Sequence, residues 1–245
     1  MFDFFFKKRN IAGAYSFLGT DFHSHLLPGV DDGSDSVETS LKLIDGLHEL
    51  GFEKIVTSPH IHHDFYRNSP ETLSPAYQLV LNELHTEKAN FHFAAEYFFD
   101  SHFENQMDEQ APLLTFGPKR ILIELPFVAY NPRFEQAIFE LVSKNYKPIL
   151  AHPERYLYLK HKLQTFARLR ELGCEFQINL LSLGGYYGEG SFEMGKSLLQ
   201  HGYADYLCTD MHHERHLNFI RHMATKRKTM KLISQHTWKN TEILS

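Results

Sequence analysis

Short β-rich apolar runs alternate with longer segments of helical periodicity along the chain, and this alternation restricts the fold more than any other feature. Apolar residues such as Val37, Leu41 and Ile44 recur three or four positions apart, which is typical of a helix packed on one face. Strands that alternate with helices favour a parallel α/β sheet, either open or closed into a barrel. The seven predicted strands are Thr20–His23, Lys54–Ser58, Phe91–Glu96, Arg120–Glu124, Pro148–His152, Glu175–Asn179 and Asp205–Thr209.

The length of 245 residues suits a single (β/α) barrel. No glycine- or serine-rich linker and no internal repeat divides the chain, so we predict one domain over residues 20–245 after a leader of residues 1–19. In the leader, a phenylalanine-rich run precedes three cations, which is the reverse of a secretory signal peptide. The segment Met1–Arg9 is a candidate for weak membrane proximity or partner contact, and a packed or mobile leader is the alternative.

Composition narrows the class of protein further. The net charge of −5 implies no broad basic patch, so we do not expect a nucleic-acid partner. Two cysteines argue against a disulfide framework and favour a reducing cytoplasm. No apolar run approaches the roughly 18–20 residues that cross a bilayer, so we expect no transmembrane segment. The oligomeric state is not indicated, but the 17 histidines suggest a metal site.

Histidines and carboxylates follow six of the seven predicted strands. Because the carboxyl ends of parallel strands share one face, these side chains are expected to converge there. Mixed imidazole and carboxylate ligands suit Mn, Fe or Zn. There are more ligands than one ion needs, so we predict two or three ions with a bridging carboxylate. The candidates are His23 and His25 after the first strand, His60, Glu96, Glu124, His152, and Asp210 with His212 after the last.

Clustered divalent ions supply a hydroxide nucleophile at neutral pH and clamp phosphate oxygens. We therefore predict a metal-dependent phosphomonoesterase that works by in-line attack of metal-bound hydroxide on phosphorus. A thiol phosphatase would need an arginine six positions after its cysteine, but Leu180 and Glu214 stand there after Cys174 and Cys208. A nucleophile elbow and a Walker A loop are also absent from the sequence.

In this order, the motifs resemble the PHP (polymerase and histidinol phosphatase) superfamily from Asp21 to the end of the chain. The opening His-Ser-His-Leu-Leu-Pro-Gly-Val-Asp-Asp-Gly33 is similar to the bacterial capsule-associated protein-tyrosine phosphatases, a manganese-dependent branch. Further matches are Ser58-Pro-His60, Ala95-Glu-Tyr97, Ile123-Glu-Leu125, Ala151-His-Pro-Glu-Arg155, Gln177-Ile-Asn179 and Thr209-Asp-Met-His212.

The resemblance implies a distorted, TIM-like barrel of seven strands, (β/α)7, with a three-metal site. Glu124 stands where many superfamily members have histidine, as it does in the phosphatase branch. Alignment to the motif favours Asp32 over Asp31, and the spacing alone leaves both open. The implied ligands are His23, His25, Glu96 and Asp210 for the first metal, Glu96, Glu124 and His152 for the second, and Asp32, His60 and His212 for the third.

The resemblance also implies two phosphate-binding arginines. Arg155 occupies the family position, where a guanidinium suits bidentate phosphate recognition, and a surface salt bridge is the alternative. Arg215 is the nearest candidate for the second, although it follows the final Asp-x-His motif at a shorter spacing than the family shows.

The function implied by the resemblance is dephosphorylation of a phosphotyrosine-bearing tail of a bacterial tyrosine kinase in capsular or exopolysaccharide biosynthesis. Mn²⁺ is the expected metal, with Fe or Zn as alternatives. A small-molecule phosphatase, with histidinol phosphate as its type substrate, is the alternative enzyme. A metal-binding regulatory module without catalysis is the alternative from another class.

Overall fold

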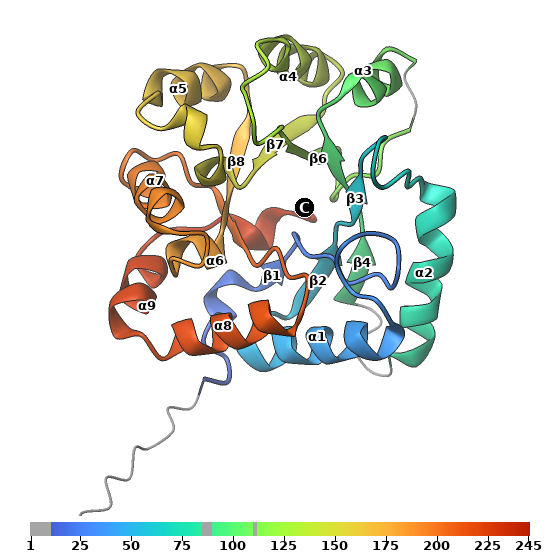
Figure 1. Cartoon of the computed structure of the whole chain (residues 1–245), viewed down its shortest axis with the longest axis vertical. Helices are drawn as coiled ribbons and strands as arrows, with labels where there is room; N and C mark the ends of the chain where they lie inside the picture. Colours follow the sequence, from blue (N-terminus) through green and yellow to red (C-terminus); the bar gives the residue numbers. More distant parts are fainter. Residues whose placement is uncertain (1–10, 85–89, 110–111) are drawn as a thin grey trace, which may run out of the picture.

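The computed structural model of the chain describes residues 11–84, 90–109 and 112–245, and the statements below concern these residues. Short parallel strands form a central ring, and helices surround it on the outside (Figure 1). The strands are β1 (Thr20–Asp21), β2 (Lys54–Thr57), β3 (His60–Ile61), β4 (Phe91–Phe93), β5 (Glu96–Phe98), β6 (Arg120–Glu124), β7 (Lys147–Ala151), β8 (Glu175–Asn179) and β9 (Tyr206–Cys208).

All seven predicted strands are present, with two differences: the predicted strand Phe91–Glu96 is broken into β4 and β5, and the predicted strand Lys54–Ser58 is followed by an additional short strand, β3. β2 pairs with β4, and β3 pairs with β5. Backbone bonds bridge the breaks, since Ala94 donates to the carbonyl of Thr57 and Glu96 to that of Pro59. The strands consequently fall into two sheets, β1-β2-β4 and β3-β5-β6-β7-β8-β9.

The ring closes between its first and last strands. After β1 and β9 the two chain segments meet in a parallel bridge, where Asp210 donates its N–H to the carbonyl of His23 at 2.7 Å. Between β1 and β9 themselves, a side chain makes the hydrogen bonds in place of backbone pairing. The Asn240 amide donates to the carbonyls of Thr20 and Leu207. The predicted distorted parallel barrel is therefore confirmed, and the distortion lies where side chains replace ladder bonds.

The helices begin and end at residues whose chemistry suits helix termini. The Ser36 side chain caps α1 by accepting from Thr39, and Gly51 ends it with a φ of 103°. Ser69 caps α2, with Pro70 at its first position. The helices are α1 (Val37–Leu50), α2 (Pro70–Glu83), α3 (Ser101–Asp108), α4 (Arg133–Ser143), α5 (Leu163–Glu171), α6 (Leu180–Leu183), α7 (Glu189–Gln200), α8 (Glu214–Ala224) and α9 (Arg227–Ser234).

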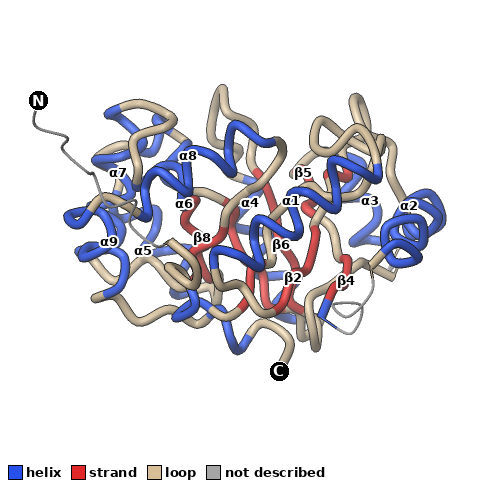
Figure 2. The backbone as a smooth tube through the Cα atoms, turned by 90° about the horizontal axis from the view of Figure 1, so that it is seen from below, coloured by secondary structure: helices blue, strands red, loops and turns tan. Residues whose placement is uncertain are grey.

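Two apolar clusters hold the layers together. The larger lies between the strands and the surrounding helices. The smaller includes Phe22, Val56 and Leu122, together with Ile243 from the end of the chain. The C-terminus lies at the lower edge of the barrel in Figure 2, and Arg120 fixes it by donating to the carbonyls of Ile243 and Ser245. The barrel is thus packed at this end.

Part of the predicted leader packs against the barrel. Tyr15 and Leu18 are buried, and the Tyr15 hydroxyl donates to the carbonyl of Ile220 in α8. The proposed membrane or partner contact of Met1–Arg9 falls on residues outside the described part of the chain. Among the described helices, none combines the length and apolar character needed to cross a bilayer.

Candidate metal centre

The structure brings all nine predicted ligands together at the carboxyl ends of the barrel strands. Buried strands order the polypeptide around each ligand: Glu124 is the last residue of β6, His60 and Glu96 begin the short outer strands β3 and β5, and the others lie in loops that follow strands. Two of them have left-handed backbones unusual for residues other than glycine, His152 with a φ of 29° and Asp210 with a φ of 49°. Backbone strain of this kind occurs where a site dictates where a side chain points.

Glu96 lies at the centre of the cluster. Its Oε1 is 3.2 Å from Nε2 of both His23 and His152. Its Oε2 is 3.1 Å from Nδ1 of His60 and 3.4 Å from Nε2 of His25. A single buried carboxylate therefore faces four imidazoles, as a carboxylate that bridges two ions would.

The remaining carboxylates lie around this centre. Oδ1 of Asp210 is 3.4 Å from Nε2 of both His23 and His25. Glu124 approaches the opposite side, with Oε1 3.4 Å from Nε2 of His152. Three groups with metal-compatible spacing result: His23 with His25 and Asp210, His23 with Glu96 and His152, and His60 with Glu96 and Glu124.

A fourth group lies nearer the surface and includes Asp32 rather than Asp31. Oδ1 of Asp32 is 3.6 Å from Nε2 of both His60 and His212. His25 also belongs to this group, so its composition is broader than the predicted third site of Asp32, His60 and His212.

The chemistry of the cluster suits divalent cations. Nε2 of His23, Nε2 of His25 and both Glu96 oxygens are buried and have no hydrogen-bond partner within the described structure. Ligand atoms about 2.1 Å from a common ion stand about 3.0–3.4 Å apart at tetrahedral or octahedral angles. The separations of 3.1–3.4 Å around Glu96 match that spacing. A bound cation would therefore give each of these four atoms a partner.

The pKa shifts follow from burial and from the crowding of charges. Burial lowers the pKa of His60 and that of His152 to about 4, so both rings are neutral and ready to bind metal. Burial raises the pKa of Glu124, and the neighbouring Glu96 carboxylate raises it further. Burial acts the same way on Glu96, but the charge of His23 and the close contacts of the carboxylate with neighbouring imidazoles outweigh burial and hold its pKa well below the ordinary value. Cations would relieve the repulsion between these two carboxylates.

Three residues outside the predicted ligand set orient the ligands, and one of them, Asp31, is the carboxylate that the spacing had left open as an alternative to Asp32. Gln177 presents Oε1 to Nδ1 of His23 at 2.8 Å and to the backbone N–H of His152 at 3.2 Å. Asn179 donates Nδ2 to Oδ2 of Asp210 at 2.7 Å. Asp31 accepts from Nδ1 of His25 at 2.8 Å. Such partners fix ring orientation and leave Nε2 free for a metal. The Gln177-Ile-Asn179 motif was the only sequence signal for the first two of these residues.

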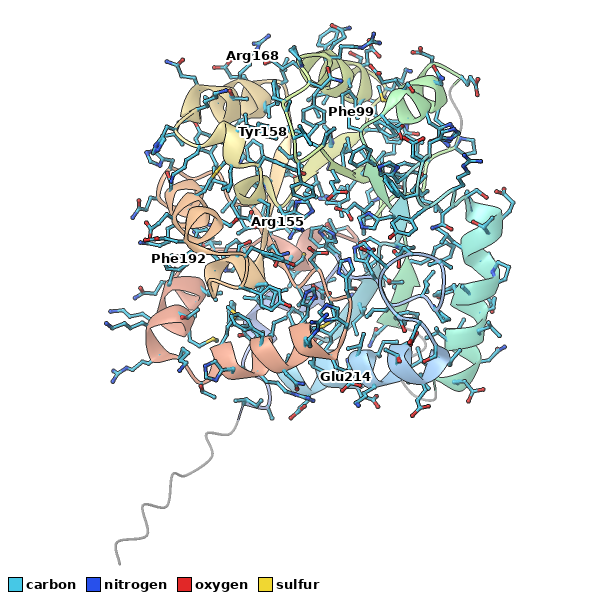
Figure 3. The ribbon with its side chains drawn as sticks, viewed as in Figure 1. Phe99, Arg155, Tyr158, Arg168, Phe192 and Glu214 are labelled. Carbon is cyan, nitrogen blue, oxygen red and sulfur yellow. The ribbon has the colours of Figure 1, made fainter. Side chains whose placement is uncertain are left out.

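Arg155 lies at the edge of the centre, near the middle of the barrel in Figure 3. Its Nη1 is 3.1 Å from Oδ2 of Asp210, and its guanidinium lies over the ring of Phe127 at 4.7 Å and over the ring of Tyr187 at 4.3 Å from the centroid. These contacts hold the cation beside the ligands. Arg215 is exposed on α8 and does not line the cavity, so the structure does not bring it to the site.

A cavity of about 580 Å³ opens above the metal ligands and has a polar floor and an apolar rim. Phe65, Phe127 and Val128 line the rim with 75%, 46% and 91% of their surface exposed. Both cysteines lie elsewhere and are buried, and burial raises the pKa of each thiol. A thiolate nucleophile is therefore not part of this site.

A parallel α/β barrel with a histidine–carboxylate centre at its strand ends is the architecture of a metal-dependent hydrolase. Comparison with known proteins makes the class specific. Residues 19–242 match the family model described as capsular polysaccharide synthesis, CpsB/CapC. The chain belongs to this family, which confirms the resemblance to the capsule-associated branch.

Several relatives are known. The chain is 28% identical to the tyrosine-protein phosphatase YwqE of Bacillus subtilis, over 81% of this chain and 79% of that protein. It is 27% identical to the putative tyrosine-protein phosphatase CapC of Staphylococcus aureus, over 78% and 76%. One solved structure comes from a report on the crystal structures of YwqE from Bacillus subtilis and CpsB from Streptococcus pneumoniae, which it describes as metal-dependent tyrosine phosphatases. It superposes with a TM-score of 0.77 over 92% of this chain and 94% of that one, at 24% identity.

A more distant fold neighbour is the histidinol phosphate phosphatase of Lactococcus lactis. It superposes with a TM-score of 0.52 over 90% of this chain and 94% of that one, at 16% identity. At this identity the likeness shows a shared fold alone.

Proposed function

We propose that this chain is a metal-dependent protein-tyrosine phosphatase that acts on the phosphorylated tail of a bacterial tyrosine kinase in capsular or exopolysaccharide synthesis. The observation that carries the proposal is the aromatic-rimmed cavity above a histidine–carboxylate centre with Arg155 at its edge. The names of YwqE and CapC support the same activity. We further propose the cytoplasm as its location, where the free thiols Cys174 and Cys208 stay reduced.

The proposed metal is Mn²⁺, bound as two or three ions, with Fe or Zn as alternatives, since all accept imidazole and carboxylate ligands. Bound ions would supply an activated water as nucleophile and neutralise charge on the phosphate oxygens. The proposed ligands are those predicted from the sequence: His23, His25, Asp32, His60, Glu96, Glu124, His152, Asp210 and His212.

The side chains of the protein bind and position the substrate. The Arg155 guanidinium is held by Asp210 and by two aromatic rings, so it is already oriented to donate to a phosphate oxygen. The exposed rings of Phe65 and Phe127 offer apolar surface to the phenyl ring of a phosphotyrosine. The leaving phenol has a pKa near 10, so its departure needs less acid assistance than that of an alkyl alcohol.

Phosphate release from a phosphotyrosine peptide, a phosphoserine peptide and histidinol phosphate, each with Mn²⁺ and with EDTA, tests the proposal. We expect release that depends on Mn²⁺ and is fastest from the phosphotyrosine peptide. Asp210→Asn is the control for contaminating phosphatase and should be inactive. Faster release from histidinol phosphate would assign the same centre to a metabolite, and release unaffected by EDTA would exclude the metal mechanism.

A further inference from the structure

One stretch of the sequence is strongly basic although the chain as a whole carries a net charge of −5. The stretch 215–241 contains no aspartate or glutamate. It forms α8 and α9, which lie side by side at one edge of the barrel (Figure 1). The net charge therefore hides a local concentration of cations. The lysines and arginines of this stretch are Arg215, Arg221, Lys226, Arg227, Lys228, Lys231 and Lys239.

The cations of this stretch divide into paired and unpaired ones. Arg221 binds Glu49, and Lys239 binds both Glu175 and Asp205, so their charges are compensated within the fold. A second set has exposed side chains that pair with no carboxylate among the described residues. One member, Arg215, lies at the start of α8. The four others, which we call the α9 basic face, lie at or in α9: Lys226, Arg227, Lys228 and Lys231.

The first-turn cations of the α9 basic face work against the stability of their own helix, whereas Lys231, in the last turn, suits the helix dipole. Arg227 and Lys228 occupy the first turn, which has no acidic residue, and there they oppose the positive end of the helix dipole. Lys231 lies three and four positions further on, next to both on the helix surface, where like charges repel. Sequences depart from the charge preferences of helices in this way mainly at functional sites. Within the described part of the chain these cations gain no compensating carboxylate, so a partner outside the chain is expected.

We propose that the α9 basic face docks on an anionic lipid bilayer. The sequence before Ile11 favours a membrane over an acidic protein, because it contains four phenylalanines followed by Lys-Lys-Arg9, and aromatic residues beside cations are typical of segments that lie in the bilayer interface. The structure of that segment is not described, but its point of attachment is. Gly13 donates to the carbonyl of Glu49, whose side chain binds Arg221 of α8.

The attachment point thus lies on the side of the molecule that carries α8. Phe17, in the described segment that follows, is also 40% exposed.

The charges close to the membrane contact determine the affinity of such binding. At physiological ionic strength, charges more than about 8 Å away are screened, so the acidic remainder of the chain contributes little at the contact. Each lysine or arginine near an anionic surface strengthens binding by about five-fold. The inference concerns where the protein is held and is independent of the phosphatase activity proposed above.

Vesicle flotation with the full chain tests this proposal. The probes are vesicles of phosphatidylcholine alone and vesicles containing phosphatidylglycerol. The test variant is Arg227→Glu/Lys228→Glu/Lys231→Glu. The matched control is Lys147→Glu/Lys160→Glu/Lys162→Glu, which changes net charge equally at three exposed lysines that pair with no carboxylate among the described residues. Thermal unfolding checks that both variants are folded.

We expect the native chain to float with phosphatidylglycerol vesicles and not with phosphatidylcholine alone. The α9 variant should lose at least about tenfold in affinity, while the control variant retains its binding. Equal losses in both variants would overturn the proposal in favour of non-specific charge attraction. If the native chain does not bind anionic vesicles but binds poly-glutamate, the proposal is overturned in favour of an acidic protein partner.

Discussion

Asp31 and Asp32 are neighbours in the chain, yet their carboxylates serve different partners. Oδ2 of Asp31 accepts from Nδ1 of His25 at 2.8 Å and from the backbone N–H of His60 at 3.0 Å. Oδ1 of Asp32 faces the imidazoles of His60 and His212 and is half exposed to the cavity. Asp31 is therefore placed to orient a ligand, and Asp32 to be one.

Substitution of each aspartate by asparagine separates these roles. Asp32→Asn should remove a ligand and lower the metal content of the chain. Asp31→Asn should leave the ligand set complete but weaken metal affinity by about 10–100-fold, because an orienting carboxylate is lost. Metal titration of the purified variants measures both effects. The reverse pattern would make Asp31 the ligand.

Gln177 should matter for metal affinity although it is not placed to touch an ion. Gln177→Leu keeps the approximate shape but removes the acceptor for His23 and for the His152 N–H, so metal should bind about 10–100-fold more weakly. Gln177→Glu retains an acceptor and should recover most of the affinity. If the leucine variant binds metal like the native chain, Gln177 serves packing alone.

Arg155→Ala should lower kcat/KM by about 10²-fold, because a preorganised donor to the phosphate is removed. Its ion pair with Asp210 adds a second effect, since Asp210 would lose one of the partners of Oδ2. Arg155→Lys retains the charge but not the bidentate guanidinium, and it should recover only part of the activity. Kinetics must therefore be paired with metal analysis. Lost activity that returns fully at high metal concentration would indicate a structural role only.

The aromatic rim should select phosphotyrosine. Phe65→Ser should lower kcat/KM for a phosphotyrosine peptide by about 2–10-fold, the usual contribution of an aromatic contact, with metal content unchanged. Phe139→Ser is a matched control, because Phe139 is also an exposed phenylalanine (56%) but lies on α4 outside the cavity. Equal losses in the two variants would point to a general effect on folding.

Asp21 should give the metal-free chain a measurable pH dependence of stability. Burial raises its pKa to about 6, although the Thr209 N–H and hydroxyl both donate to it. Between the ordinary value of 3.8 and about 6 the folded chain binds the proton more tightly than the unfolded chain does. This contribution to stability is therefore fully present below pH 3.8 and is lost as the pH rises through 6, in total on the order of 3 kcal/mol.

The variant Asp21→Asn should abolish that change. Denaturant unfolding in EDTA at pH 4 and pH 7 measures it, and the native chain should lose more stability between the two values than the variant does. Parallel behaviour of the two proteins would show that Asp21 does not titrate in this range.

Much of the fold and the site was open to prediction because both follow from local order. Apolar runs such as Arg120–Glu124 are buried along their whole length, so their composition marks them as strands. Parallel strands expose their carboxyl ends on one face, so Glu96, Glu124 and His152 had to lie near each other once the topology was known. Fold and ligand positions could thus be predicted together.

Tertiary structure decided what depends on side-chain direction. Spacing cannot distinguish Asp31 from Asp32, and it cannot show that Arg155 points into the cavity while Arg215 does not. These outcomes are fixed by packing between segments distant in sequence, such as Asp210 with Arg155 and Asn179. The role of Gln177 likewise exists only after β1, β7 and β8 meet. The sequence by itself determined which residues reach the end of the barrel, and only three-dimensional packing decided which of their atoms face the metal centre.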